Sequence, residues 1–349
     1  MKKQKKDYEP INLEGIKSYS IKRRKNLVSI KQFAKVIEHK EFSKFLDSLP
    51  EILAGNNLRD VIDTIVKATN KNRQVVMAIG AHVIKCGLSP IIIDLMNRGI
   101  ITAVAMNGST AIHDYEISLI GETSEDVSHG LKDGSFGMAR ETAEAFRRAA
   151  SQAIVLSPEP TRPPCGNATT RPNGLAGRER GNKQQKSIGL DIGLGRALGR
   201  QIIKDKNKYK QYSLLAAGAK LGIPVTVHVA MGTDTIHMHP NISGSDMGES
   251  SHVDFKILCS IVANLEGGVW MNVGSAVIMP EVFLKALAVA RNLGKKVKDF
   301  TAVNMDMIQH YRPQTNVVQR PTTHGYSITG HHEIMLPLLR LGILSRLKK

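Results

Sequence analysis

Several features that mark other protein classes are missing from this sequence of 349 residues. No apolar run approaches the eighteen or so residues needed to cross a membrane. The basic start, MKKQKKDYEP, is followed by no apolar stretch of the kind found in secretory signals. The three cysteines are scattered and form no CxxC pair, which fits reduced thiols better than a disulfide framework or a zinc site. We therefore expect a cytoplasmic protein with no membrane partner.

Aromatic residues are also scarce, at 5%, although the net charge is +17. A charge of this size is found in proteins that bind nucleic acids. Much of it lies in two segments that look peripheral: residues 1–40 hold twelve Lys and Arg against four Asp and Glu, and residues 151–186 hold six against two. No nucleic-acid-binding motif is visible, and so few aromatic side chains offer little base stacking. The distribution favours a solvated basic segment at residues 1–40 over a nucleic-acid interface.

From about residue 74, short apolar stretches alternate with helical patterns, and hydrophobic residues make up 42% of the chain. The alternation predicts strands at residues 74–79, 101–106, 224–229, 268–273 and 300–305. It predicts helices at residues 89–97, 110–119, 214–220, 253–265, 280–293 and 332–347. Apolar strands separated by helices indicate an α/β fold whose mostly parallel sheet is covered on both faces.

One segment breaks this pattern. Residues 151–186 contain five prolines and four glycines but few large apolar side chains, so they cannot form a packed element. A compact domain seldom needs so long an irregular loop. We therefore expect a single α/β domain over residues 41–349, interrupted at residues 151–186 by a disordered insertion.

Glycines and small polar residues follow the predicted strands. In a parallel sheet, ligands bind beyond the carboxyl ends of the strands, and small residues let the backbone approach a phosphate or a ribose. Each of these positions alone could be a tight turn, but five together favour a nucleotide or a phosphorylated ligand. A GxGxxG motif after the first strand is missing, so the standard dinucleotide fingerprint is not present. The positions are Gly80-Ala81-His82, Asn107-Gly108-Ser109, Gly232-Thr233-Asp234, Gly274-Ser275 and Asp306.

Three long motifs carry a resemblance to a known family. They are GAHVIKCGLSPIIIDLMNRGIITAVAMNGSTAIHDYEISLIGETSEDV (80–127), PVTVHVAMGTDTIHMHP (224–240) and GVWMNVGSAVIMPEVFLKALAVARNLG (268–294). They resemble the core of prokaryotic deoxyhypusine synthase-like proteins, and the similarity runs from about Ile16 to the C-terminus except for residues 151–186. The resemblance implies a doubly wound, Rossmann-like sheet, bound NAD, and a homotetramer with active sites at subunit interfaces.

The resemblance also implies positions for the cofactor. Gly330 precedes His331 near the end of the chain, and this pair corresponds to one of the family's NAD-contacting loops. Asp306 joins the set because it follows a strand at the same edge. The NAD-binding residues expected in this way are Ala81, His82, Lys85, Asn107, Gly108, Ser109, Gly274, Ser275, Asp306 and His331.

This chain departs from the family at the residues that handle the substrate. Deoxyhypusine synthases oxidise spermidine with NAD and form an imine between its aminobutyl group and a lysine. The resemblance implies that lysine within residues 316–323, which read NVVQRPTT and hold only Arg320 as a base. A guanidinium does not lose its proton and cannot form the imine. Acidic residues of the family fall at His113 and near His237, and a histidine of the family falls near Met279.

The stretch GTDTIHMHPNISGSD (232–246) leaves three interpretations open. His237 and His239 could bind a metal with His228 or Asp234, although Pro240 forces a turn and no HExxH motif exists. They could satisfy buried backbone groups. They could also form the polar wall of an active site.

A second group of polar residues lies in one predicted helical turn. His113, Asp114 and Glu116 could each serve as a general base. The pair His331-His332, at the start of the last helix, fits either a neutral ring that contacts a nucleotide or a helix cap.

The sequence therefore predicts an NAD-dependent transferase of the deoxyhypusine synthase-like type that acts on an amine-bearing small molecule without the imine step. Two alternatives remain, a regulatory nucleotide-binding protein and a metal-dependent hydrolase built on His237 and His239. We expect no resident metal in the favoured case. Its candidate catalytic residues are His113, Asp114, Glu116, Asp234, His237 and Arg320.

Overall fold

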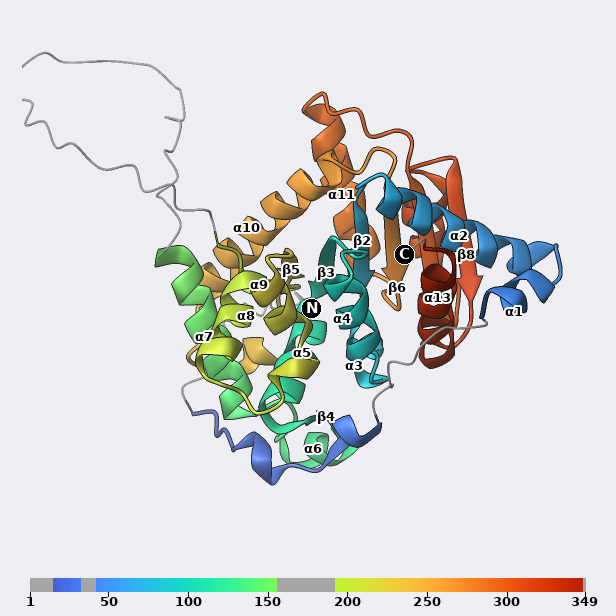
Figure 1. The fold of residues 1–349 in the computed structure, drawn as a ribbon. Coiled ribbons are helices and arrows are strands. Elements are labelled where there is room, and N and C mark those ends of the chain that lie inside the picture. Colours follow the sequence, from blue (N-terminus) through green and yellow to red (C-terminus); the bar gives the residue numbers. More distant parts are fainter. Residues whose placement is uncertain (1–14, 33–41, 156–191, 348–349) are drawn as a thin grey trace, which may run out of the picture.

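A six-stranded parallel sheet forms the centre of the molecule (Figure 1). The computed structural model describes residues 15–32, 42–155 and 192–347. The strands lie in the order β5-β3-β2-β6-β7-β8, and each neighbouring pair is parallel. Their bounds are β2 Val75–Ile79, β3 Ala103–Asn107, β5 Val225–His228, β6 Val269–Val273, β7 Thr301–Asp306 and β8 His324–Thr329.

The strand order places a crevice at one point of this sheet. Numbered along the chain, the six strands run 3-2-1-4-5-6, which is the arrangement of doubly wound, dinucleotide-binding sheets. The chain proceeds outward from β2 to β3 and β5, then returns to the other side of β2 with β6. The direction reverses between β2 and β6, and ligands bind at such a switch point. The predicted α/β class with a doubly wound, mostly parallel sheet is confirmed.

Helices cover both faces of the sheet. α10 and α11 pack on one face, while α2, α4 and α13 pack on the other (Figure 1). The helices are α1 Phe42–Ser48, α2 Leu53–Asn70, α3 Ala81–Lys85, α4 Ser89–Asn97, α5 Gly108–Ile120, α6 Val127–Asp133, α7 Arg140–Val155, α8 Leu194–Lys204, α9 Leu214–Leu221, α10 Gly244–Ala263, α11 Ile278–Asn292, α12 Tyr311–Pro313 and α13 His332–Arg346.

Burial on both faces explains why the strands read as unbroken apolar runs. In β2, Val76 and Ala78 face α10 and α11. The alternate residues of the strand, Val75, Met77 and Ile79, face the opposite layer. Trp270 of β6 stacks on Phe283 of α11 with ring centroids 4.1 Å apart. Alternate side chains of each strand thus enter two separate cores, so neither face leaves a polar stripe.

β5 is the strand at one end of the sheet, and side chains of α10 form hydrogen bonds with backbone groups along its outer edge. The Asp254 carboxylate accepts hydrogen bonds from the backbone N–H of Val227 and of Gly195, both at 2.8 Å. The Ser251 hydroxyl accepts from Val229 N–H at 3.1 Å. These contacts replace the neighbouring strand that an exposed edge would otherwise recruit. Burial raises the pKa of Asp254 to about 7, although its two backbone donors act in the opposite direction.

The described part of the basic N-terminal segment packs against the domain. Strand β1 (Asn26–Ser29) pairs antiparallel with β4 (Glu122–Glu125), and Ile21 is fully buried. Arg24 donates to Glu116 at 2.6 Å and to Glu125 at 3.3 Å. Of the six basic side chains between residues 15 and 32, five are exposed, as predicted for a solvated segment, whereas Arg24 is held by its carboxylate partners. Residues 1–14 and 33–40 lie outside the described residues.

Helix α7 corrects the start of the predicted insertion. The helix continues through Val155, and Ala153 is buried, so residues 151–155 belong to the packed domain. The rest of the predicted insertion, residues 156–186, lies outside the described chain. Across the described ranges, no helix is both long and apolar enough to span a membrane.

Candidate functional site

Two glycines bring the loops after β2 and β6 together at the switch point. The backbone N–H of Gly80 donates to the carbonyl of Val273 at 3.0 Å. A Cβ added at Gly80 would collide with the Gly274 carbonyl, and one added at Gly274 would lie 3.0 Å from the ring of His332. Gly274 also has a φ of +64°, a conformation that other residues rarely adopt. Glycine at both positions lets the two loops meet without side chains between them.

A pair of histidines lies directly beside these glycines. His82 on α3 and His332 on α13 approach each other with their Nδ1 atoms 3.0 Å apart. The Nε2 atom of His332 is 3.2 Å from the carbonyl oxygen of Met305 and 3.8 Å from Asp306 Oδ1. His332 is 1% exposed, whereas His82 is half-buried. Burial and the neighbouring His332 lower the pKa of His82.

Other groups on α3 and α13 surround this pair. The Cys86 sulfur lies 3.4 Å from His82 Nε2 and also contacts the Glu333 carboxylate. Burial and Glu333 raise the pKa of Cys86 to about 11, so it remains a thiol. His331 has a side chain that is 65% exposed and lies 3.8 Å from Glu333. Of the predicted His331-His332 pair, His332 therefore enters the cluster and His331 faces solvent.

The residues predicted after β3 and β5 meet at the start of α5. Asn107 caps this helix, because its Oδ1 accepts from Thr110 N–H at 2.9 Å. Asp234 accepts backbone hydrogen bonds from Ser109 and from Ala230. A Cβ added at Gly108 would collide with the Asp234 carboxylate. The carboxylate thus lies over the electropositive end of α5, and burial raises its pKa to about 6.

The three polar residues of α5 point to different partners. Asp114 is fully buried and accepts from Ser213 Oγ at 2.5 Å and from Leu214 N–H at 2.7 Å at the start of α9. Burial raises its pKa to about 6. Its acceptor sites are filled from the start of α9, and its role as a general base stays a prediction.

Glu116 and His113 belong to a network with the N-terminal segment. Glu116 accepts from Arg24, from Thr142 at 3.1 Å and from Thr123. His113 Nδ1 lies 2.7 Å from the Thr123 hydroxyl. Burial, with the positive charges of Lys85 and Arg24, lowers the pKa of His113 to about 3. Glu116 accepts hydrogen bonds from three donors, and its role as a general base stays a prediction, while His113 is a neutral ring at physiological pH.

Each of the three histidines at and after β5 has a hydrogen-bond partner within five residues in the chain. His237 Nδ1 accepts from Gly232 N–H at 3.3 Å, and its buried Nε2 has no hydrogen-bond partner among the described residues. His239 Nδ1 accepts from Asn241 N–H at 3.4 Å. His228 Nε2 bonds the Thr226 hydroxyl at 2.9 Å, and burial lowers its pKa to about 3. Within the described ranges, no group of three or more His, Cys, Asp or Glu side chains is arranged to hold a metal ion.

Arg320 lies apart from these residues. It follows a π-helix at Gln314–Gln319, and its side chain donates to Asn316 at 3.0 Å. Two residues later, the Thr322 hydroxyl donates to the carbonyl of Phe300, just before β7 begins. The backbone at Arg320 therefore approaches the amino end of the sheet, and its predicted place among the catalytic residues is not supported by this geometry.

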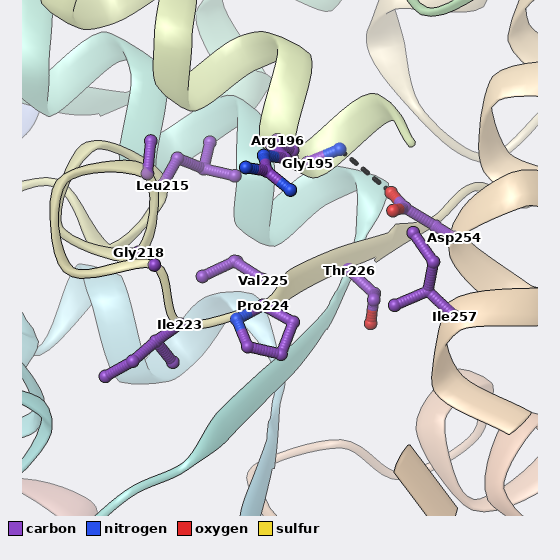
Figure 2. Close-up of a pocket in the computed structure, with 12 residues that line it drawn as sticks. Gly195, Arg196, Leu215, Gly218, Ile223, Pro224, Val225, Thr226, Asp254 and Ile257 are labelled. Carbon is purple, nitrogen blue, oxygen red and sulfur yellow. Dashed lines mark hydrogen bonds between the residues drawn. The ribbon is translucent and has the colours of Figure 1, made fainter. Parts of the chain in front are cut away.

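A well-formed hollow lies elsewhere, beside the amino end of β5 (Figure 2). It has a volume of about 290 Å³ and lies between α8, α9, β5 and α10. Figure 2 shows Arg196 and Leu215 opposite Pro224 and Ile257, with the hydrogen bond from Gly195 to Asp254 drawn as a dashed line. The hollow is lined by Pro224, Val225 and Thr226 at the amino end of β5, and its lining includes no residue of the loops that meet at the switch point.

Comparison with known proteins gives similarity of fold. The chain matches no protein-family model and no curated protein. Its structure is similar to that of a candidate LOR/SDH protein from Methanococcus maripaludis S2, with a TM-score of 0.50 and 13% identity over 85% of this chain and 71% of that one. At this identity the likeness concerns the fold alone.

Two weaker likenesses have TM-scores below 0.5. One is to AgrE in a complex with ornithine and NAD⁺, at 0.47 and 13% identity, where the alignment covers 89% of this chain and only 34% of AgrE. The other is to a candidate deoxyhypusine synthase from Entamoeba histolytica, at 0.42 and 10% identity, with 96% of this chain and 98% of that one covered.

Proposed function

We propose that this protein binds NAD(H) at the β2–β6 switch point and belongs to the deoxyhypusine synthase family. The observation that carries the proposal is the 3-2-1-4-5-6 strand order with Gly80 and Gly274 in contact at the reversal. The long motifs at residues 80–127, 224–240 and 268–294 supply these same loops. A dinucleotide would lie across the crevice, with its phosphates beside the glycine loops.

Asp234 gives the proposed site a preference between dinucleotides. Its carboxylate lies beside Gly108, at the end of β3, the second strand of the sheet. In doubly wound folds an acidic residue in this region binds the ribose hydroxyls of NAD, whereas the 2′-phosphate of NADP needs a cation there. The site therefore favours NAD(H) over NADP(H).

We propose a transferase on an amine-bearing small molecule that does not proceed through an imine with the protein. Residues 316–323 contain no lysine, and the guanidinium of Arg320 cannot replace one. His113 and His237 are neutral or weakly basic rings where the family has carboxylates, because burial lowers the pKa of both. Such a wall suits a substrate that is less cationic than a polyamine.

The same absence of lysine favours the alternative of a regulatory NAD-binding subunit. In this alternative, the protein would bind the dinucleotide at the same crevice, and binding would change its assembly state. The two proposals differ in whether NAD⁺ is reduced when an amine is added. Stopped-flow absorbance at 340 nm with a panel of small amines separates them, since only the transferase forms NADH.

We also propose a homotetramer with the crevice near subunit contacts. Five large apolar side chains around the carboxyl end of the sheet are between 45% and 74% exposed in the single chain: Met231, Val277, Ile308, Tyr311 and Ile334. Exposed apolar groups gathered at one end favour a protein interface.

Isothermal titration with NAD⁺, NADH and NADP⁺, together with native mass spectrometry of the purified protein, tests these proposals. We expect micromolar binding of NAD(H), weaker binding of NADP⁺ and a mass of four chains. A chain that binds no dinucleotide under any of these conditions contradicts the proposed function, and a monomer contradicts only the assembly.

A further inference from the structure

The hydrogen-bond pattern around His332 determines which of its ring nitrogens carries hydrogen. Its Nε2 lies 3.2 Å from the carbonyl oxygen of Met305, and a carbonyl can only accept. The Asp306 carboxylate, 3.8 Å away, is also an acceptor. Nε2 of His332 must therefore carry a proton, and in a neutral ring this leaves Nδ1 as a lone pair.

That lone pair dictates the state of His82. The two Nδ1 atoms are 3.0 Å apart, so one proton lies between them. With His332 as the acceptor, His82 must donate from Nδ1, and a neutral His82 then has its lone pair on Nε2. This assignment leaves both rings uncharged, which is the arrangement with the fewest buried charges. Packing of the His332 ring against Gly274 holds the geometry.

One further side chain, that of Cys86, lies close to Nε2 of His82. Cys86 Sγ is 3.4 Å from His82 Nε2 and 3.6 Å from Nδ1, so the sulfur lies over the ring and not in the ring plane, where the Nε2 lone pair points. The thiol also has the Glu333 carboxylate as an acceptor, and when it donates there, Nε2 of His82 has no hydrogen-bond donor among the described residues. His82 itself is half-buried and lies on the first turn of α3, which begins directly after Gly80 at the switch point.

We infer that His82 offers Nε2 as a hydrogen-bond acceptor to the ligand at the switch point, and that His332 holds it in this tautomer. The ligand group must then be a donor, such as a hydroxyl or an amide N–H, rather than a carbonyl or a phosphate oxygen. The ribose hydroxyls and the carboxamide of a nicotinamide dinucleotide have this chemistry. The ligand part of the inference rests on the proposed NAD(H) binding; the tautomer does not.

The charged and titratable neighbours indicate how the acceptor responds to pH. His82 is faced by Lys85 and Cys86 on α3, by His332 and Glu333 on α13, and by Asp306 at the end of β7. Glu333 and Asp306 favour the protonated ring, but burial, His332 and Lys85 oppose it, and the pKa of His82 is lowered overall. The acceptor therefore persists from alkaline to mildly acidic pH and is lost only when His82 takes a second proton.

Two substitutions of His332 distinguish its effect on the tautomer of His82 from its effect on packing. His332→Asn places an amide oxygen near the position of Nδ1 and keeps an acceptor for His82. His332→Gln places its amide near Nε2, keeps the donor to Met305, and removes the acceptor. His324→Gln, at an exposed histidine at the amino end of β8, is the matched control.

Nitrogen-15 NMR of histidine-labelled full-length protein reports the tautomers directly. We expect His82 to be protonated at Nδ1 in the wild type, in His332→Asn and in His324→Gln, and to lose this preference in His332→Gln. A wild-type His82 protonated at Nε2 overturns the inference. Spectra of His82→Gln and His82→Met assign the signal, and these substitutions at a half-buried residue are available if the His332 variants do not fold.

Titration with NAD⁺ then tests the ligand contact. We expect His82→Met to weaken binding about tenfold, the scale of one lost hydrogen bond, and His82→Gln, which keeps an acceptor, to weaken it less. Equal affinity of the wild type and His82→Met overturns the contact. If the wild type binds no NAD⁺ although His82 has the expected tautomer, the proposed function fails and the ligand contact fails with it, whereas the tautomer assignment stands.

Discussion

Strand β5 is associated with two buried aspartates that look alike and differ in their surroundings. Asp254 and Asp234 both accept hydrogen bonds from backbone N–H groups, and burial raises the pKa of both. Asp254 is 1% exposed and bonds the middle of β5 to the start of α8. Asp234 closes a loop whose residues 231–233 are exposed, at the end of the sheet where ligands bind.

The difference shows that burial and a perturbed pKa do not by themselves identify a functional carboxylate. Removing the Asp254 carboxylate would leave two backbone N–H groups at the edge of the sheet, those of Val227 and Gly195, without their acceptor. The donors of Asp234 lie at a helix start beside an exposed loop, so a ligand could exchange with them. Position in the topology distinguishes Asp254, at the edge of the sheet, from Asp234, at the carboxyl end where we propose that the ligand binds.

The largest effect is expected for Asp254→Ala. The substitution leaves the buried N–H groups of Val227 and Gly195 without acceptors, at about 1–3 kcal/mol each, so we expect the free energy of unfolding to fall by about 4 kcal/mol. Urea denaturation followed by circular dichroism measures it. Glu249→Ala, at an exposed carboxylate on the same helix, is the control and should change stability by less than about 0.5 kcal/mol. Equal stability of the two variants would remove the structural role.

The raised pKa of Asp254 also predicts a pH dependence. The carboxyl has a pKa near 3.9 in the unfolded chain and about 7 in the folded protein. The folded state binds the proton more tightly, so the stability from this group is present below about pH 4 and is lost as pH rises to about 7. Asp254→Asn should flatten the wild-type decline in unfolding free energy over this range. A variant whose pH profile parallels that of the wild type contradicts the assignment.

These two aspartates also show what sequence patterns could and could not foresee. The run of apolar residues at 268–273 predicts β6, because burial on both faces selects such runs. β8 was missed, since HGYSIT mixes polar and apolar residues and five of its six side chains are at least partly exposed. Asp234 follows a glycine after a strand and was found by that pattern. Nothing local distinguishes Asp254 from a surface residue of an amphipathic helix.

The candidate site, too, has features that the sequence predicts and features that only the fold reveals. The glycines and small residues after the strands were predictable, because each lies at the carboxyl end of a recognisable strand. The contact between His82 and His332 joins residues 250 apart, so only the folded chain brings them together. The partnership of Arg24 with Glu116 was missed for the same reason, because these residues are 92 apart in the chain.

A smaller effect on stability, but a clear one on binding, is expected for Asp234→Asn. The amide keeps one acceptor for the backbone donors and removes the negative charge, so we expect the unfolding free energy to change by less than about 1 kcal/mol. Without the charge, a 2′-phosphate is no longer repelled, and the preference for NAD⁺ over NADP⁺ should fall about tenfold. Isothermal titration with both dinucleotides measures the ratio. An unchanged ratio would place Asp234 with Asp254 as a structural carboxylate.

The smallest effect is expected at Arg320, which has neither the burial of Asp254 nor the position of Asp234. Its side chain is exposed and reaches Asn316, away from the switch point. Arg320→Ala should leave NAD⁺ affinity unchanged within about twofold, because no contact in the crevice is lost. The wild type incubated with NAD⁺ and spermidine and then reduced with borohydride should carry no aminobutyl adduct, since a guanidinium does not lose its proton in proteins and forms no imine. An adduct located on a lysine by peptide mass spectrometry, Lys85 at the crevice being the first to inspect, would show that another amine has taken over the chemistry that residues 316–323 cannot perform.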